Sequence, residues 1–443
     1  MGAGAAAGSA GTDGAAAAPT TTTTTTTPSG PPRPAGWGRP FALARPVAAD
    51  LADPLVAFDA RGSAAISYDA FDEDDPALAS AYALAQAASG GGLGPARRLP
   101  AVQQVLGLAF AGATPELLTG SSPPGLACCS SAEVEQLSAG GAVVARSRPL
   151  DGLAGASEGQ LLELPGGRLA IVADQRGVWV MRAAGRGRYS APSRLAGVAT
   201  DIGAVAGTAL SGPAGAVSWS ATAPGSSASG PRIYLASASA RTAPGRPRVA
   251  IALPGADSVD GLSIGSRGRV PTLAWVASWF DSRDGYHSRV FVADAVGRRP
   301  AAVALSPPGA QASSVSLAAD RDGAQVITWR ECATASVCTA QAALRPAGGR
   351  WGPVRTLGSL DATDAPVTAE SSAGAALVGW VSHGRVLAAE AAAGARTFDR
   401  ARRLSGAGTA SNPALAFAPD GDALAVWTQG LATETAVAAR LSS

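Results

Sequence analysis

Short apolar stretches separated by glycine-containing turns recur along most of this chain. Residues 415–427, LAFAPDGDALAVW, show the pattern most clearly: one apolar stretch enters a Pro-Asp-Gly turn, and a second ends in an aromatic residue. Stretches of this length, bounded by Gly and Pro, predict β-strands rather than helices. Both faces of the second stretch are largely apolar, so we expect this strand to lie between two neighbouring sheets.

Seven other parts of the sequence are looser copies of this unit, and the glycine of the turn aligns them. In the best copies an aromatic residue follows the glycine by six positions, at Gly62/Tyr68, Gly323/Trp329, Gly374/Trp380 and Gly421/Trp427. Weaker copies start at Gly215 and Gly268, and degenerate ones at Gly112 and Gly167. The copies recur about every 51 residues, and a strand-rich repeat of roughly 40–50 residues is typical of β-propeller blades.

A second motif, an aromatic residue or Leu followed six positions later by Leu, predicts the outer strand of each blade. It occurs at residues 93–99, 189–195, 351–357 and 398–404, with a weaker copy at 144–150. Another copy, residues 37–43, precedes the first glycine anchor, whereas only one strand follows the last repeat. We therefore predict an all-β, eight-bladed β-propeller over residues 37–443, closed by its N-terminal strand. Seven blades is the alternative if the degenerate copies merge.

The predicted outer strands contain arginines, which are suited to protecting exposed sheet edges from pairing with other chains. Anion binding is the alternative role for these residues. They are Arg97, Arg98, Arg355, Arg402 and Arg403.

Composition narrows the class of protein further. All 35 cationic residues are Arg, and the formal net charge of +2 argues against a dedicated nucleic-acid surface. No apolar run reaches the roughly 18 residues of a transmembrane helix, so we predict no membrane span. We expect a monomer.

Residues 1–36 form a low-complexity leader rich in Ala, Gly, Thr and Pro, which we predict to be disordered. Thr/Pro tracts often tether domains outside the cell. The leader lacks the charged and Leu-rich regions of a signal peptide, yet its composition favours an extracellular or cell-surface location.

The four cysteines suggest an oxidising compartment. Cys332 and Cys338 bracket a short turn between two predicted strands, and we predict a disulfide there. Cys128 and Cys129 are adjacent, where a bond requires a strained ring, so two free thiols and a vicinal disulfide remain as alternatives. Adjacent cysteines in an eight-bladed propeller resemble quinoprotein dehydrogenases, but the Thr-Gly-Lys docking motif of that family is missing.

Two groups of residues are weak candidates for a binding site. The first is an acidic loop with Asp72, Asp74 and Asp75, which lacks the spacing of a calcium-binding loop. The second is FDSRDGYH, whose carboxylates and histidine could form an acid/base set, although a turn at Asp-Gly also explains it. Its candidate residues are Phe280, Asp281, Asp284 and His287. We predict no metal site, no catalytic residue and no cofactor.

The D-G-x-A-x-x-x-W unit, together with the W-G-x-x-x-x-L outer strand, resembles secreted propeller-repeat proteins of high-GC actinobacteria, and the resemblance covers residues 37–443. It implies the fold and no activity. Sialidase-like propellers differ, because their Trp follows the Gly more closely.

The function that the sequence favours is an extracellular binding or interaction module for a protein or glycan ligand. We expect the ligand on the face that carries the long loops between second and third strands. The alternative is a carbohydrate-active hydrolase or lyase on the same face, for which two carboxyl groups should converge in one pocket.

Overall fold

A computed structural model describes most of the chain from residue 36 onward. The described ranges are 36–43, 50–71, 80–85, 93–99, 102–123, 129–138, 141–153, 155–156, 158–174, 177–195, 201–222, 230–282, 285–297, 300–406, 408–430 and 435–442. Every regular element in these ranges is a β-strand, so the all-β prediction is confirmed. The predicted leader, residues 1–36, lies outside them except for Gly36.

The strands pair antiparallel into sheets in chain order. The first sheets contain β3 (Asp50–Phe58), β4 (Ala64–Phe71), β5 (Ser80–Ala85) and β6 (Arg97–Leu99); β7 (Gln104–Ala111), β8 (Thr114–Ser121), β9 (Ser131–Leu137), β10 (Val143–Arg146) and β11 (Leu150–Asp151); and β12 (Glu158–Leu164), β13 (Gly167–Asp174), β14 (Gly177–Ala184) and β15 (Ser193–Arg194). Then come β16 (Asp201–Ala209), β17 (Ala214–Thr222), β18 (Arg232–Ser239) and β19 (Arg248–Ala252).

The second half of the chain repeats this order, with one sheet that is twice as wide. That eight-stranded sheet contains β20 (Ser258–Arg267), β21 (Val270–Asp281), β22 (Gly285–Asp294), β23 (Val303–Ala304), β24 (Gln311–Ala319), β25 (Gln325–Thr334), β26 (Val337–Arg345) and β27 (Arg355–Leu360). The next sheet contains β28 (Val367–Glu370), β29 (Ala376–Ser382), β30 (Arg385–Ala391) and β31 (Arg402–Arg403). The last contains β32 (Ala410–Phe417), β33 (Ala423–Gln429) and β34 (Thr435–Ser442), together with β1 (Gly36–Trp37) and β2 (Phe41–Ala42).

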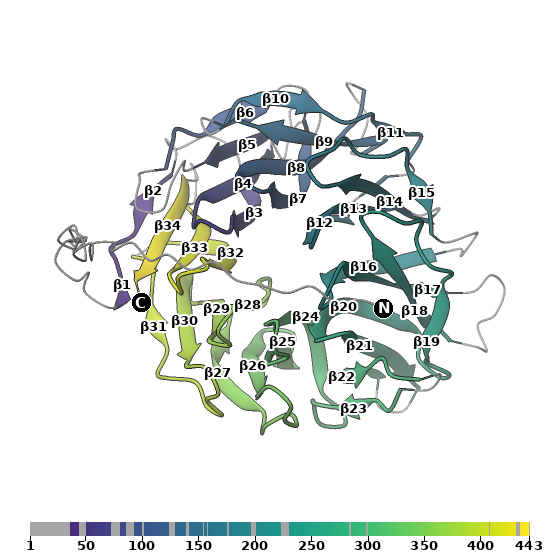
Figure 1. Cartoon of the computed structure of the whole chain (residues 1–443). Coiled ribbons are helices and arrows are strands. Elements are labelled where there is room, and N and C mark those ends of the chain that lie inside the picture. The colour runs from purple at the N-terminus through teal and green to yellow at the C-terminus, as the bar shows by residue number, and fades with distance from the viewer. Residues whose placement is uncertain are drawn as a thin grey trace, which may run out of the picture. The chain divides into compact units, whose positions relative to one another are not determined.

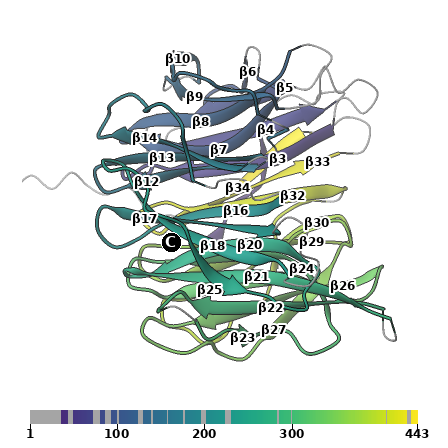
Figure 2. The same cartoon turned by 90° about the vertical axis from the view of Figure 1, so that its right-hand side faces the viewer.

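The first strand of each four-stranded set contacts the first strand of the next set. The contacting strands are β3, β7, β12, β16, β20, β24, β28 and β32, and β32 also contacts β3. Figure 1 shows these strands innermost, with the later strands of each set progressively further out. Figure 2 shows the strands of successive sets running across the view, one set above another. This radial arrangement of antiparallel sheets is that of a β-propeller.

The glycine that aligns the sequence repeats occupies the turn between first and second strands. Gly62, Gly323, Gly374 and Gly421 have φ between 80° and 90°, a left-handed conformation that glycine adopts without strain. An aspartate three residues earlier closes two of these turns. Asp59 Oδ1 accepts a hydrogen bond from the Ser63 amide (2.7 Å), and Asp320 Oδ1 accepts one from the Ala324 amide (2.7 Å).

The aromatic residue of the repeat is buried in six of the eight core clusters of the described residues. Tyr68, Trp219, Trp275, Trp329, Trp380 and Trp427 are all 0–1% exposed, which confirms their predicted position between sheets. Across the sheet, several stack on an aromatic residue of the third strand: the ring centroids of Trp219 and Tyr234 lie 5.6 Å apart, as do those of Trp275 and Phe291. The predicted outer-strand arginines are exposed at sheet edges, as edge protection requires.

The two chain ends of the propeller unit share one sheet. Gly36 and Trp37 of β1 pair with Ser442 and Leu441 of β34, and β2 pairs further along the same strand. The Trp37 indole also donates a hydrogen bond to Glu390 Oε1 (2.8 Å) in the preceding sheet. The N-terminal outer-strand motif therefore pairs with β34.

The expected location of the long loops is wrong for some sheets. Between second and third strands, β25 and β26 are joined by residues 335–336, and β29 and β30 by residues 383–384. The connections to the outer strands are longer there, at residues 346–354 and 392–401. Loop length alone therefore does not mark one end of the sheets as the binding face.

Candidate functional site

The two ends of the sheets differ in backbone geometry. At one end, the first strands β3, β7, β16, β20, β24 and β32 each contain a register shift typical of a β-bulge soon after they begin. We call this end the bulge face. The opposite end, with the tight turns between first and second strands, is the turn face. Bulges leave backbone groups unpaired and redirect side chains, which suits them to functional sites.

Three bulges contain a non-glycine residue in the left-handed region: Asp53 (φ 48°), Ser314 (φ 54°) and Asn412 (φ 49°). This conformation is strained for these residues, and it recurs at one position of the repeat. Side chains of the neighbouring set bond to the freed backbone: Asp69 Oδ1 accepts from the Val105 amide (3.0 Å), and Asp364 Oδ1 from the Asn412 amide (3.2 Å).

Charge also differs between the two faces. Carboxylates on the described part of the bulge face outnumber arginines, whereas the turn face is rich in arginine. The bulge face carries Asp53, Asp69, Asp257, Asp260, Asp281, Glu331, Asp361 and Asp364 against Arg232, Arg289, Arg330 and Arg385. The turn face carries both signs: Arg61, Arg186, Arg188, Arg241, Arg246, Arg269, Arg321, Arg350, Arg396 and Arg400, with Asp59, Asp294, Asp320, Asp322, Glu370, Asp399, Asp420 and Asp422.

The β21–β22 hairpin projects beyond its sheet on the bulge face. Its pairing continues to Asp281 and Gly285, whereas β20 pairs with β21 only as far as Ser278. Phe280 and Tyr286 are cross-strand partners and therefore share one side of this ribbon. By strand alternation this is the side of Val276 and Val290, which pack against β24 and β25. Phe280 is 70% and Tyr286 49% exposed, so both rings present surface to a ligand.

The neighbouring β25–β26 hairpin presents a carboxylate towards that side. Glu331 follows Ile327 and Trp329 at alternate positions, and those two residues pack against β21 and β22. Its carboxylate accepts a hydrogen bond from the Trp329 indole (3.1 Å), which fixes its orientation. The disulfide between Cys332 and Cys338 links the two strands of this hairpin, and this prediction is confirmed.

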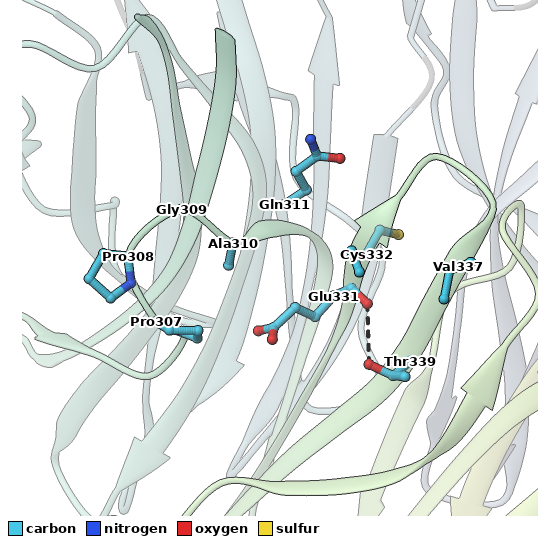
Figure 3. A pocket seen from close by; sticks show the side chains of 10 residues that line it. Pro307, Pro308, Gly309, Ala310, Gln311, Glu331, Cys332, Val337 and Thr339 are labelled. Atoms are coloured by element: carbon cyan, nitrogen blue, oxygen red, sulfur yellow. Dashed lines mark hydrogen bonds between the residues drawn. The ribbon is translucent and has the colours of Figure 1, made fainter. Parts of the chain in front are cut away.

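A pocket of about 310 Å³ opens between the β25–β26 hairpin and the connection that leads into β24. Figure 3 shows the Glu331 carboxylate pointing from its strand towards Pro307 and Pro308, with Gln311 on the far side. Val337 and Thr339 complete the wall on β26. We call this pocket together with Phe280 and Tyr286 the hairpin site.

Ser288 ties the floor of the hairpin site to the β21–β22 hairpin. Its amide donates to the Ala310 carbonyl (3.0 Å), and its hydroxyl donates to the Ala312 carbonyl (2.7 Å). The parallel pair of Ser288 with Gln311 is the link that joins the two four-stranded sets into one sheet. Both walls of the site are therefore anchored to one hydrogen-bonded sheet.

Asp260, at the bulge of β20, holds Tyr286 in place. Its Oδ2 accepts a hydrogen bond from the Tyr286 hydroxyl (2.7 Å), and its Oδ1 accepts one from the Ser258 hydroxyl. Burial alone would raise the pKa of Asp260, but hydrogen bonds from Ser258, Ser278 and Tyr286 outweigh burial and lower that pKa below its usual range. Asp260 is therefore a fixed anion beside the aromatic pair.

The structure separates the residues predicted in FDSRDGYH. Phe280 lies on one side of the ribbon, whereas Asp281 and His287 alternate to the other, where the His287 ring packs against Trp279 at 6.1 Å. Asp284 lies outside the described residues, so the acid/base set stays a prediction. Asp72, Asp74 and Asp75 also lie outside them.

The adjacent cysteines are described only in part. Cys129 is buried in the core formed by Leu118, Val134 and Met181, whereas Cys128 lies outside the described residues. The vicinal disulfide therefore stays a prediction.

Sequence reasoning missed Asp260, Tyr286 and Glu331 as members of one site. A polar residue followed by Gly inside an apolar strand, as at Asp260-Gly261, is a signal for a bulge and could have marked the first of them. The other two gave no such signal, because the contact between neighbouring sets brings them together.

Burial perturbs two carboxyl groups outside the hairpin site. Burial, opposed by the hydrogen bond from the Val105 amide and reinforced by Asp53, raises the pKa of Asp69 to about 8. Burial, followed by the nearby charge of Asp320, raises the pKa of Glu370 to about 9. Asp69 lies on the bulge face and Glu370 on the turn face, and each has a structural role between sheets.

Of three comparisons with known proteins, one found similar chains, all of them solved structures. No family model matches the sequence, and no curated protein matches it. The chain is similar to the Dos1 propeller (12% identity, TM-score 0.49, 91% of this chain and 95% of that chain) and to a protein of unknown function from Dyadobacter fermentans (11%, 0.44, 91% and 97%). It is also similar to the β-propeller domain of the Trilobed protease from Pyrococcus furiosus (7%, 0.42, 81% and 98%). Because these TM-scores are below 0.5, we assign the fold from the strand pairing and packing described above.

A search of the described residues for a helix long and apolar enough to cross a membrane found none.

Proposed function

We propose that residues 37–443 form an eight-bladed propeller that acts as an exported binding module, with the hairpin site as its ligand-binding site. The site is proposed to recognise a protein or a glycan. The observations that support this most directly are the exposed rings of Phe280 and Tyr286, the second held by Asp260, and the pocket in the neighbouring set that contains Glu331. Large exposed aromatic side chains around a pocket are typical of binding surfaces.

Eight blades follow if the wide sheet counts as two, because it contains two four-stranded antiparallel sets joined by one parallel pair. Closure by the N-terminal strand is supported by the pairing of β1 and β2 with β34 and by the contact of β3 with β32.

Export is supported by the disulfide between Cys332 and Cys338, since such bonds persist mainly in oxidising compartments. The Thr/Pro-rich leader and the resemblance to secreted actinobacterial propellers favour the same location.

The hydrolase alternative is not proposed. Glycosidase chemistry requires two carboxyl groups that flank the scissile bond. Among the described residues that line the pocket, Glu331 is the sole carboxylate.

A binding screen tests the proposal. Residues 37–443 are assayed against arrays of glycans and peptides, alongside F280A and Y286A. The matched control is F41A, which removes an exposed phenylalanine from the outer strand β2. We expect ligands whose signal falls at least tenfold in F280A and stays unchanged in F41A. Ligands that bind F280A, Y286A and wild type equally would overturn the hairpin site.

A further inference from the structure

Glu331 gives the pocket of the hairpin site a single negative charge. Among the described residues that line this pocket, it is the only one with a charged side chain. Its Oε2 accepts a hydrogen bond from the Trp329 indole (3.1 Å), whereas its Oε1 makes no hydrogen bond within the described part of the chain. Figure 3 shows the carboxylate extending towards Pro307, so an acceptor oxygen faces the pocket. A carboxylate oxygen without a donor favours a positively charged ligand.

The arginines on neighbouring strands leave this charge without a counter-ion. Arg330 alternates to the opposite side of β25 from Glu331, where it donates to the Ala362 carbonyl. Arg289 of β22 donates to the Ser306 carbonyl (3.0 Å). No ion pair between described residues includes Glu331. A ligand can therefore supply the positive charge.

The walls around the carboxylate are mostly aliphatic. Pro307 and Pro308 lie on one side and Val337 on the other, and Ala333 also lines the pocket. Val337 is 58% exposed, so its side chain is available to a ligand. The volume of about 310 Å³ is at the lower end of the range of about 300–1,000 Å³ that is typical of ligand pockets. These dimensions and walls favour one side chain with an apolar stem and a charged end.

Both walls of the pocket are held in place before a ligand binds. Cys332 lines the pocket, and its disulfide to Cys338 closes the loop that carries Val337. On the opposite wall, the Ser288 amide donates a hydrogen bond to the Ala310 carbonyl (3.0 Å). Fixed walls reduce the entropy that is lost on binding.

The composition of the pocket distinguishes between types of cation. A quaternary ammonium is recognised by aromatic faces, and none of the residues that line the pocket is aromatic. A guanidinium pairs best through two parallel hydrogen bonds to both carboxylate oxygens, yet Oε2 of Glu331 already accepts from the Trp329 indole. A primary ammonium is compact and carries three donors on a flexible four-carbon stem. Glu331 Oε1 and the side-chain oxygen of Gln311, which lines the same pocket, can accept from it.

From these observations we propose that the pocket binds a lysine side chain of a polypeptide ligand. This inference rests on the proposed function, because it names the ligand of part of the same site. The ammonium donates to Glu331 Oε1, and the stem lies against Pro307, Pro308 and Val337. The exposed rings of the β21–β22 hairpin take no part in this contact.

The test uses fluorescent twelve-residue Gly-Ser peptides with blocked ends and one central residue, which is lysine, acetyllysine, arginine or glutamine. Binding to residues 37–443 is measured by fluorescence anisotropy at low and high salt. We expect the lysine peptide to bind about tenfold more tightly than the acetyllysine and glutamine peptides, because only lysine offers Glu331 a charged donor. It should bind several-fold more tightly than the arginine peptide. Its affinity should fall as salt rises.

Variants locate the binding in the pocket. E331Q is expected to weaken binding of the lysine peptide about tenfold, to the level of acetyllysine, while Gln at position 331 can still accept the indole hydrogen bond. The matched control is D322N, since Asp322 is an exposed acid in a turn of the same sheet on the opposite face. V337S should weaken binding several-fold, and its control is V303S, which changes an exposed valine of β23 outside the pocket. Circular dichroism checks that every variant is folded.

The outcomes separate this inference from the proposed function. If lysine and acetyllysine peptides bind equally, or if E331Q or V337S binds the lysine peptide as wild type does, the inference is overturned. If a glucosamine oligomer binds more tightly than the lysine peptide in a Glu331-dependent way, the polypeptide ligand is wrong. If a ligand from the arrays depends on Phe280 while the lysine peptide does not depend on Glu331, the inference fails and the proposed function stands. If no ligand depends on either residue, both fail.

Discussion

The bulge face and the turn face are built from the same strands, yet they differ in almost every local feature. The turn face repeats itself: glycines in the left-handed region, a capping Asp and many arginines. The bulge face varies from set to set. It holds strained non-glycine residues and the hairpin site. The turn face serves the fold, because every set needs the same turn. The bulge face is where backbone groups and side chains are available for binding.

The largest test of this contrast compares two aromatic residues. Trp380 is fully buried in the repeat position, whereas Phe280 is 70% exposed. Trp380→Ala is expected to lower the free energy of unfolding by about 3–5 kcal/mol, because it leaves a cavity between sheets. Phe280→Ala is expected to change stability by less than about 0.5 kcal/mol. Chemical denaturation measures both, and a comparable loss in F280A would mean that this ring is a core residue.

The disulfide is expected to have the next largest effect. Cys338→Ser removes the cross-link near the tip of the β25–β26 hairpin and should lower the free energy of unfolding by about 2 kcal/mol by the loop-entropy estimate. Thermal unfolding with and without reductant checks this. The melting temperature of wild type in reductant should match that of C338S in oxidising buffer. If reductant lowers the melting temperature of C338S further, the loss does not come from this disulfide.

Substitutions that change backbone strain should have opposite effects on stability at the two faces. Gly374→Ala is expected to cost about 1–2 kcal/mol, because its φ is 82° and the new methyl would lie 2.9 Å from Asp320 Oδ2. Asn412→Gly relieves a left-handed residue and is expected to be neutral or slightly stabilising. Urea unfolding measures the free energy of unfolding of both variants. If N412G loses as much stability as G374A, the backbone at Asn412 is not strained.

One further expected effect on stability depends on pH. The pKa of Asp69 in the folded protein is about 8, above the value of about 4 for an unfolded chain. The protonated carboxyl therefore adds stability that is fully present below about pH 4 and is lost as pH rises through about 8. Asp69→Asn should be more stable than wild type at pH 8, where the buried carboxyl of wild type ionises, and nearly equal to it at pH 4. The test measures the free energy of unfolding of both proteins at pH 4 and pH 8. If the difference between D69N and wild type is the same at the two pH values, the prediction is wrong.

The sequence predicts the turn face much better than the bulge face. Gly374 and Trp380 recur at a fixed offset because every set needs the same turn and the same core residue, so repetition reveals them. Asp260, Tyr286 and Glu331 occur once each. Tyr286 and Glu331 belong to the β21–β22 and β25–β26 hairpins of neighbouring sets, and no local propensity encodes how those sets pack. Loop length was a poor guide, as the short turn at residues 335–336 shows.

Ser288 has a kinetic consequence. Ser288 bonds to the carbonyls of Ala310 and Ala312 and so fixes the position of the connection that lines the pocket. A recess whose width is fixed in advance loses little conformational entropy when it is filled. Binding would then start at a rate set by diffusion, and differences in affinity between ligands would lie mainly in their dissociation rates.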